Sequence, residues 1–401
     1  MGVGTLYKTM KILYVASADL TGEYGSLGSV RHIIEVSENL FHLGNRVKLI
    51  VPNYGSYPHA TPVDIIYVPL INIRFLRTII SEFLAPFFML AYLVFWKPDI
   101  IYWRQAYLTI FPVLISRLLG KAILTEVNGL TLDEVESEPI SELRKRVILS
   151  FERFNYLHAD HLICVAPKIR NRILTHYNLP AEKVSVILNG VNSKKMPVID
   201  TREAKIQIGI NPDYKIVGFV GHFFPWDGIE YLIGAAHKIV QEIEHVRFLI
   251  IGHGLWGQHL PELAVKMGLA DYFIFTGKIP WEELCYYINA FDVATAPYAK
   301  TINLQSGRSS LKLLEYFACK KPVVASQTDA IPEVMDIAEM GLGVTVPPED
   351  ANTLAQAILR LLQDDGLREN MGRKGRDYVE KKRSWRIVAQ KTQAIIATLL
   401  V

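Results

Sequence analysis

Short apolar runs alternate with helical patterns along nearly the whole chain, and this alternation restricts the possible folds more than any other feature. Strands that are joined by helices pair in parallel and are covered on both faces. The predicted strands are residues 11–16, 46–51, 64–68, 99–102, 122–127, 161–165 and 184–188 in the first half, and 216–220, 246–251, 272–275, 292–296 and 323–325 in the second. The sequence therefore predicts an α/β protein with parallel sheets.

The alternation breaks once, and the break divides the chain into two domains. From residue 192 to 210 the sequence is polar and includes Pro197, and an Asn-Pro-Asp turn follows. A chain of 401 residues is also too long for one ordinary core. We therefore expect a first domain at residues 1–195, a linker at 196–212 and a second domain at 213–383, both doubly wound, with a cleft between them.

Charge and cysteine content narrow the class of protein. The net charge of +3 is too small for a nucleic-acid-binding protein that neutralises phosphates. Cys164, Cys285 and Cys319 lie far apart within apolar or helical patterns, which predicts buried thiols in a reducing compartment. A short polar tail leads directly into the first strand, so we expect no signal peptide and a cytoplasmic location.

One segment, residues 79–96, is unusually apolar. Its few polar side chains come at its start, basic residues flank it, and its uninterrupted apolar part, 83–96, contains Pro86 and is short for a membrane-spanning helix. It is either a core helix of an α/β domain or a partly exposed helix that docks on a membrane surface through aromatic side chains and basic flanks. The second alternative adds a peripheral contact at the inner face of the membrane.

The segment 301–326 has the pattern of a ligand-binding loop, a helix and a strand. Gly307, Ser309 and Ser310 make a polar break, and a helical pattern covers 311–319. A Lys-Lys-Pro stop signal and a β-branched run follow. Because the amide groups at a helix N-terminus lack intrahelical partners, they favour an anion such as a diphosphate.

Charged side chains on this helix suit a nucleotide-sugar diphosphate. Arg308 and Lys312 place positive charge beside the helix N-terminus, and Glu315 can accept hydrogen bonds from two vicinal hydroxyls of a sugar or ribose. One face of the helix is expected to look into a cleft and the other to pack: Lys312, Glu315 and Cys319 on the first, Leu311, Leu314 and Ala318 on the second. The alternative is an ordinary capped helix with a solvated lysine and glutamate.

Two further loops follow predicted strands. Gly25 and Gly28 lie in the turn after the first strand, where a ligand could approach the backbone closely, although a surface loop explains them as well. Glu126, Asn128 and Gly129 lie at the carboxyl end of their strand, the edge of an open sheet at which ligands bind. An Asn-Gly turn between strand and helix is the alternative.

Residues 252–257 match the G-x-G-x-x-G pattern of dinucleotide-binding proteins. In that fingerprint the next strand ends in an acidic residue that holds the ribose, whereas here Asp271 precedes the strand at 272–275 and Lys278 follows it. We therefore do not expect a nicotinamide cofactor. The chain also contains no D-x-D and no histidine spacing typical of a metal site, so we expect no metal and no other cofactor.

Taken together, these stretches resemble the retaining glycosyltransferases of family 4, which have the GT-B fold. The resemblance covers nearly the whole chain. Its motifs are Gly28 with Arg31-His32 and the helix to Gly44, EVNG at 126–129, ADHLICVA at 159–166, VILNGVN at 186–192, FVG at 219–221, IIGHG at 250–254, FTGKIPWEEL at 275–284, FDVATAPY at 291–298 and SSLKLLEYFACKKPVVAS at 309–326. Each motif is weak alone, and their order makes the set specific.

The resemblance implies a GT-B fold, in which two Rossmann-like domains face each other and the last helix, 384–401, crosses back to the first domain. It implies an acceptor held mainly by the first domain, with Glu126 and Asn128 facing the reacting sugar, and a nucleotide-sugar donor held mainly by the second. The residues that we expect near the donor are Gly28, His222, Lys278, Ile279, Tyr298, Gly307, Arg308, Ser309, Ser310, Leu311, Lys312 and Glu315. Among these, Glu315 would hold the ribose, the amides of Ser309 to Leu311 the diphosphate, and Lys278 with Ile279 the base.

Three departures from the family pattern concern the phosphates. Gly307 stands where the first of two paired glutamates is expected, His222 replaces a basic residue, and Asp227 replaces a lysine. Because a carboxylate has the wrong sign for a diphosphate, we expect Arg308 and Lys312 to replace the missing charge. With Glu126 and Asn128, Lys312 completes the predicted catalytic set.

The expected function is metal-independent transfer of a sugar, with retention at the anomeric carbon, from a nucleotide diphosphate sugar to a glycan or lipid-linked acceptor. Polysaccharide biosynthesis is the setting that such a family implies. Two alternatives stay open: a nucleotide-sugar epimerase or hydrolase on the same fold, and a non-catalytic subunit that binds nucleotide sugars.

Overall fold

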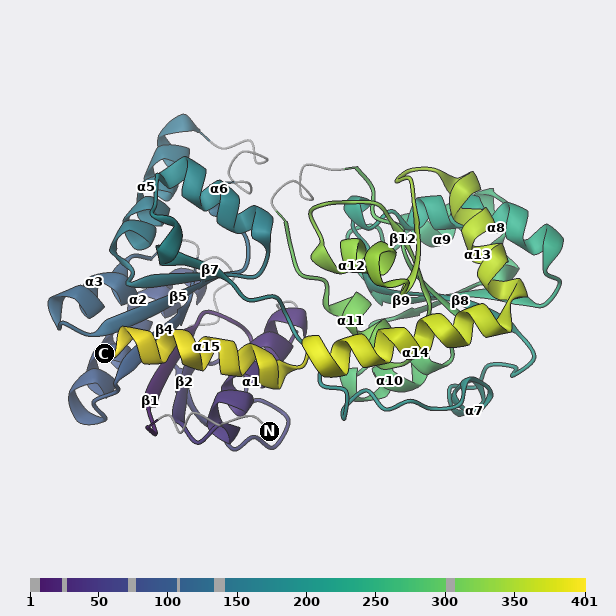
Figure 1. Cartoon of the computed structure of the whole chain (residues 1–401). Helices are drawn as coiled ribbons and strands as arrows, with labels where there is room; N and C mark the ends of the chain where they lie inside the picture. Colours follow the sequence, from purple (N-terminus) through teal and green to yellow (C-terminus); the bar gives the residue numbers. More distant parts are fainter. Residues whose placement is uncertain (1–7, 24–26, 71–76, 107–108, 133–140, 301–306) are drawn as a thin grey trace. The chain divides into compact units, whose positions relative to one another are not determined.

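The computed structural model describes residues 8–23, 27–70, 77–106, 109–132, 141–300 and 307–401. The chain divides into two compact units, Met1–Asn189 with Trp385–Val401, and Gly190–Ser384 (Figure 1). Each unit is an α/β sheet structure and is described by itself.

The first unit is built on a parallel seven-stranded sheet in the order β3-β2-β1-β4-β5-β6-β7. Its strands are β1 Lys11–Ala16, β2 Arg46–Pro52, β3 Asp64–Val68, β4 Ile100–Arg104, β5 Ala122–Val127, β6 His161–Cys164 and β7 Val184–Val186. Its described helices are α1 Leu27–His42, α2 Arg77–Phe95, α3 Phe111–Leu118, α5 Glu142–His158, α6 Pro167–Tyr177, the short 3-10 helix Ala181–Lys183, and α15 Trp385–Leu399. The last helix, α15, lies beside α1 although the two are far apart in sequence (Figure 1).

The second unit repeats the plan with a parallel six-stranded sheet in the order β10-β9-β8-β11-β12-β13. Its strands are β8 Lys215–His222, β9 Val246–His253, β10 Phe273–Gly277, β11 Val293–Ala296, β12 Val323–Ser326 and β13 Gly343–Val346. Its helices are α7 Thr201–Gln207, α8 Ile229–Glu242, α9 His259–Lys266, α10 Trp281–Asn289, α11 Leu311–Ala318, α12 Pro332–Met340, α13 Ala351–Gln363 and α14 Asp365–Lys382, with short 3-10 helices at Pro225–Asp227 and Ala270–Tyr272.

Both faces of the second sheet are buried. Neighbouring residues of β8, Ile216 and Val217, belong to different core clusters, one shared with α10, α11 and α12, the other with α8, α9 and α13. This burial explains why the strands are continuous apolar runs rather than alternating ones. The predicted doubly wound fold is confirmed, and the three cysteines are buried free thiols as expected.

The segment 196–212, which we expected to be a linker, lies within the second unit and carries helix α7. Asp200 caps α7 by accepting from the amides of Arg202 and Glu203, and the buried Lys205 ammonium is 2.7 Å from the Asp292 carboxylate. The chain passes between the units at residues 189–190 and 384–385. In the second unit the segments next to these two crossing points lie side by side, because the Val191 amide donates to the Arg383 carbonyl at 2.8 Å.

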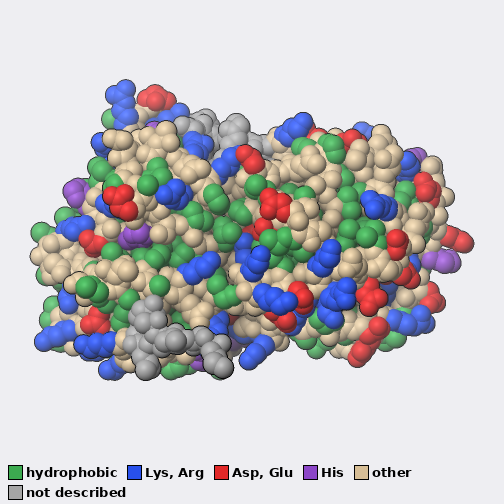
Figure 2. Space-filling view, in the orientation of Figure 1, with side chains coloured by type: hydrophobic (Ala, Val, Ile, Leu, Met, Phe, Trp, Pro, Cys, Tyr) green, Lys and Arg blue, Asp and Glu red, His purple; other side chains and the backbone are tan. Residues whose placement is uncertain are grey.

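The charges on the visible surface are mixed, with both signs interspersed in Figure 2, as a small net charge implies. Among the described residues, no helix combines the length and the apolar character that crossing a membrane requires.

Candidate functional site

Each sheet has one place where the strand order reverses, between β1 and β4 in the first unit and between β8 and β11 in the second. Ligands of open α/β sheets bind outside the carboxyl ends of the strands at such a switch point. A cluster of polar side chains lies at this place in each unit.

In the second unit the cluster surrounds the start of α11. The Tyr298 hydroxyl, just after β11, is 2.9 Å from the Ser310 hydroxyl, and the Arg308 guanidinium lies 5.5 Å from the centre of the Tyr298 ring. The Nε and Nη2 atoms of Arg308 are buried and have no hydrogen-bond partner among the described residues. A cation with buried, unpaired donors at the carboxyl edge of a sheet is suited to an anionic ligand.

Lys312, in the first turn of α11, forms a largely buried ion pair with Asp227, and the two charged atoms are 2.7 Å apart. Its ammonium also lies 4.2 Å from the centre of the Phe219 ring. Burial lowers the pKa of Lys312, and the nearby Asp227 carboxylate opposes that shift. Lys312 therefore neutralises the Asp227 carboxylate, whose negative charge would otherwise repel a diphosphate.

Glycines create the space for this arrangement. A side chain at Gly221 would come within 2.6 Å of the Lys312 ammonium, and one at Gly252 would meet the Gly221 carbonyl oxygen at 1.8 Å. Gly254 has a φ of +158° and lies against the backbone of Phe223. The G-x-G-x-x-G pattern thus reflects the close approach of two chain segments at the ends of β8 and β9.

The end of β8 adds His222, and the end of β9 adds His253, with their ring centres 5.5 Å apart. Burial lowers the pKa of His222, the neighbouring His253 adds to this shift, and the Asp227 carboxylate opposes it. Lys278 is exposed directly after β10. Three neighbouring strand ends therefore present groups that favour an anion.

The amides at the start of α11 are not all available to a diphosphate, contrary to our expectation for Ser309 to Leu311. The Ser310 amide donates to the Glu333 carboxylate at 2.9 Å, and the Ser309 hydroxyl donates to the same carboxylate at 2.6 Å. Arg383 forms an ion pair with Glu333, and both side chains are buried. An internal carboxylate from α12 thus satisfies the helix N-terminus.

Helix α11 is buried on nearly all sides, including most of the face that we expected to look into a cleft. Glu315 is 4% exposed and Cys319 is fully buried, as are Leu314 and Ala318. Leu311 is half-buried at the first helical position. The helix packs against α14 as well as the sheet, which the local pattern of residues 311–319 does not reveal.

The remaining donor residues of the second unit lie at the same edge of the sheet. Gly307 has a φ of +86°, which favours glycine there, and the next amide, that of Arg308, donates to the Ala330 carbonyl. Ile279 is half-buried against the core, beside the exposed Lys278. The structure therefore brings Tyr298, Arg308 and Lys312 together, and places Ile279 at the rim.

In the first unit the cluster centres on Glu126, which is 1% exposed. Its Oε1 atom lies 2.9 Å from His32 Nε2 and 2.8 Å from Arg104 Nη1, and its other oxygen accepts from the Tyr102 hydroxyl. Burial opposes ionisation, yet the His32 and Arg104 groups and the Tyr102 hydroxyl outweigh it and hold the pKa of the Glu126 carboxyl well below its usual range. Glu126 is thus a buried anion that positions its neighbours.

Asn128 and Ser29 are the more accessible members of this cluster. The Asn128 amide nitrogen donates to Glu126 at 2.5 Å, and Arg104 Nη2 donates to the Ser29 hydroxyl at 3.2 Å. Gly28 precedes Ser29 in the first turn of α1. The Glu126 carboxylate does not itself reach solvent, so we assign it a positioning role in place of the expected direct contact with a sugar.

Tyr102, Arg104, Glu333 and Arg383 belong to the two clusters but were not among our sequence-based candidates. The parallel register pairs Arg104 with Glu126 across β4 and β5, so correct strand alignment could have suggested this contact. Arg383, directly after α14, and Glu333, on α12, are 50 residues apart, and no local pattern connects them.

We predict that Glu126 stabilises the first unit in a pH-dependent way. Because its pKa is depressed in the folded state, its contribution is complete above about pH 5 and declines progressively as the pH falls from the ordinary carboxyl pKa toward the depressed folded-state pKa. The unfolding free energy of wild type should exceed that of Glu126→Gln most at neutral pH, and the difference should shrink below about pH 4. Urea unfolding at a series of pH values measures this. A difference that stays constant down to about pH 3 would contradict the assignment, and Glu262→Gln, at an exposed position, serves as the control.

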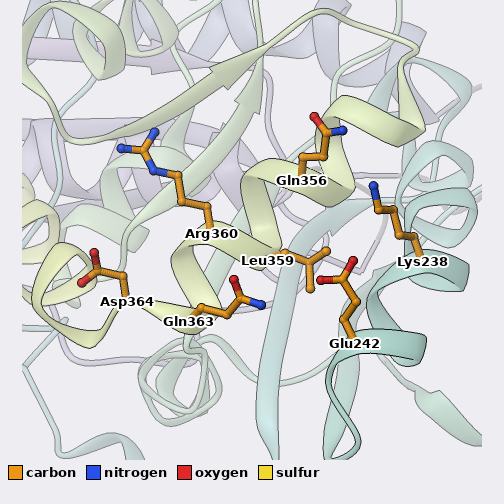
Figure 3. A pocket seen from close by; sticks show the side chains of 7 residues that line it. All are labelled: Lys238, Glu242, Gln356, Leu359, Arg360, Gln363 and Asp364. Carbon is orange, nitrogen blue, oxygen red and sulfur yellow. The ribbon is translucent and has the colours of Figure 1, made fainter.

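In the described part of the chain, no group of three or more His, Cys, Asp or Glu side chains is placed to hold a metal ion. A shallow hollow of about 430 Å³ lies between α8 and α13, lined by Lys238, Glu242, Gln356, Leu359, Arg360, Gln363 and Asp364 (Figure 3). Because Lys238 and Glu242 lie in the last turns of α8, this hollow is at the edge of the sheet opposite the strand ends described above.

Comparison with known proteins agrees with the fold. A family model described as "Glycosyltransferase Family 4" matches residues 27–195, and one described as "Glycosyl transferases group 1" matches residues 214–364. An uncharacterized glycosyltransferase of Methanocaldococcus jannaschii is 28% identical over 251 residues, and the match covers 62% of each chain.

Solved structures share the fold over nearly the full length. Sucrose-phosphate synthase of Thermosynechococcus elongatus superposes with a TM-score of 0.77 at 22% identity, over 97% of this chain and 99% of that one. HepE of Anabaena, in complex with UDP-glucose, superposes with a TM-score of 0.74 at 16% identity, over 97% of this chain and all of that one.

The fold and the two family models together define the class, a two-domain α/β glycosyltransferase with the GT-B fold. The chain belongs to the group 1 glycosyltransferases of family 4, as the resemblance implied. The match to the Methanocaldococcus jannaschii relative spans about three fifths of that relative's length.

Proposed function

We propose that this chain is a retaining glycosyltransferase that moves a sugar from a nucleotide diphosphate sugar to a glycan or lipid-linked acceptor. The observation that carries the proposal is the Arg308 guanidinium at the switch point of the second sheet, whose buried donors have no partner within the described part of the chain. The structural likeness to HepE, which was solved with UDP-glucose, supports a nucleotide sugar as donor.

The donor diphosphate is assigned to the edge formed by the cations Arg308 and Lys278 and by the His222 imidazole. Lys312 contributes indirectly, because its charge is shared with Asp227. Glu315 receives the ribose hydroxyls, and Ile279 borders the base together with Lys278. Cations of the chain, rather than a metal ion, neutralise the diphosphate in this assignment.

The reaction breaks the bond between the anomeric carbon and the diphosphate oxygen and forms a bond from that carbon to the acceptor oxygen. For the configuration to be retained, the acceptor hydroxyl attacks from the face that the diphosphate leaves. The acceptor proton passes to the departing phosphate oxygen, so no separate protein base is required. Arg308 stabilises the negative charge that develops on the diphosphate.

In the first unit, we assign the contacts with sugar or acceptor to Asn128 and to the segment around Gly28 and Ser29. Glu126 positions them, because it fixes Asn128 directly and Ser29 through Arg104. The proposed location is the cytoplasm, where nucleotide sugars serve as donors, with polysaccharide biosynthesis as the setting.

A nucleotide screen tests the donor site. We expect one of UDP, GDP, ADP and TDP to raise the melting temperature and to bind in calorimetry, and we expect Glu315→Ala to weaken that binding at least tenfold because the ribose loses its charged acceptor. Glu315→Gln, which keeps an acceptor oxygen, should lose less.

The matched control is Glu262→Ala, which removes an exposed carboxylate of α9 and should leave binding unchanged. Absence of binding by all four nucleotides would overturn the proposed function. Binding that survives Glu315→Ala would place the nucleotide elsewhere.

A further inference from the structure

Helix α2 exposes a continuous apolar surface. The exposed side chains of its described part beyond residue 82 are all apolar, and the large ones are Phe83, Phe87, Leu90, Val94 and Phe95, of which Phe83 is 59% and Phe95 is 86% exposed. Residues 83, 87, 90 and 94 recur at helical spacing and share one side of the helix. We call these five residues the α2 face.

The opposite side of α2 is fixed to the protein. Met89 is fully buried and Leu93 is 4% exposed, and both belong to the core of the first unit beneath β2 and β3. The helix is therefore fixed to the core with the α2 face directed away from it. Single exposed apolar residues are ordinary, but a contiguous aromatic and aliphatic surface marks an interaction site.

Lysines gather around the carboxyl end of this helix. Lys11 donates to the Trp96 carbonyl at 3.1 Å, Lys121 donates to the Pro98 carbonyl at 3.2 Å, and the Lys48 ammonium lies 5.5 Å from the centre of the Trp96 ring. Lys97 is exposed at the end of the helix. Two carboxylates are close, since Asp64 pairs with Lys48 and Asp99 accepts from the Lys11 amide, so the lysines outnumber the acids.

We propose that the α2 face docks on the surface of an anionic lipid bilayer, with the aromatic side chains inserted at the interface and the lysines beside the headgroups. Aromatic rings and lysines are the side chains that a membrane interface accommodates best. Charge favours a lipid surface over a second copy of the chain as the binding partner of the α2 face. An anionic headgroup neutralises the lysines, whereas another copy brings the same positive charge.

The adjacent helix α3 extends the surface. It contacts α2, and at its carboxyl end Leu118 is 75% exposed and Leu119 is 45% exposed. Both leucines lie between Arg117 and Lys121 in sequence, so exposed apolar side chains have basic neighbours here as they do at the end of α2.

Vesicle co-sedimentation of the full chain tests the proposal. We expect binding to vesicles of phosphatidylcholine mixed equally with phosphatidylglycerol, weaker binding to phosphatidylcholine alone, and a decrease with salt. Phe83→Ser/Phe87→Ser should weaken binding at least tenfold, and Lys97→Glu by about fivefold or more. The matched control is Leu255→Ser/Val265→Ser, which removes two exposed apolar side chains of the second unit and should change nothing.

Light scattering and a thermal melt of each variant accompany the assay. Failure of wild type to bind either vesicle, or equal binding by the α2 and control variants, would overturn the proposal. A wild-type dimer that Phe83→Ser/Phe87→Ser converts to a monomer, without vesicle binding, would assign the α2 face to a second copy. Nucleotide binding, measured on the same samples, reports on the proposed function separately.

Discussion

Replacing Arg308 with glutamine is expected to weaken the binding of a nucleoside diphosphate by about a hundredfold. The guanidinium carries buried donors without a partner among the described residues, so a phosphate oxygen can accept from it without displacing an existing contact. A charge-assisted pair of this kind contributes about 2–3 kcal/mol, which corresponds to a loss of that size. Calorimetric titration with the nucleotide that stabilises wild type most measures the effect.

Arg360 provides a matched control for Arg308. It is an exposed arginine on α13 that lines the hollow in Figure 3, at the opposite edge of the same sheet. Arg360→Gln should leave nucleotide binding within about a factor of two of wild type. Equal losses of nucleotide affinity in Arg308→Gln and Arg360→Gln would indicate a general effect of charge. A loss of affinity only in Arg360→Gln would place the nucleotide site in the hollow.

Replacing Lys312 with methionine is expected to destabilise the second unit by about 3–5 kcal/mol. The ammonium pairs with Asp227, whose side chain is only 6% exposed, and the substitution leaves that carboxylate buried without its partner. Urea unfolding followed by circular dichroism measures the loss. The double variant Lys312→Met/Asp227→Asn should regain a large part of it, because the uncompensated charge is then removed.

A surface ion pair serves as a control that distinguishes the effect of burial on stability from the effect of charge. Arg202 and Asp213 are 2.9 Å apart in the same unit, but their side chains are about two thirds exposed. Arg202→Met should therefore cost no more than about 1 kcal/mol. If the two single variants cost the same, or if the double variant is less stable than Lys312→Met, the buried pair does not have the role assigned to it.

The sequence predicts the fold well because most strands are short apolar runs that are bounded by helical patterns, although β13, Gly343–Val346, was not predicted. The predicted strands at 11–16 and 122–127 match β1 and β5. The segment 196–212 was expected to be a linker because its composition is polar, yet α7 forms there through its Asp200 cap and the burial of Lys205. A buried polar contact with a residue 87 positions away is not visible in local composition.

The site was predicted in part, and the misses have one physical cause. Arg308 and Lys312 were chosen because they lie beside a helix N-terminus, a local signal. The sequence does not show that Asp227 pairs with Lys312, nor that Glu333 takes the Ser310 amide, because both partners come from distant elements. Glu126 looked accessible at a strand end, but side chains from β4 and α1 enclose it.

The measurement that tests the central claim most directly is a crystal structure of the chain with the nucleoside diphosphate that gives the largest thermal shift. The account predicts diphosphate oxygens within hydrogen-bond distance of the Arg308 guanidinium, beside His222 at the end of β8, and ribose hydroxyls on Glu315. A nucleotide bound away from these residues, for example in the hollow between α8 and α13, would contradict the assignment of the donor site.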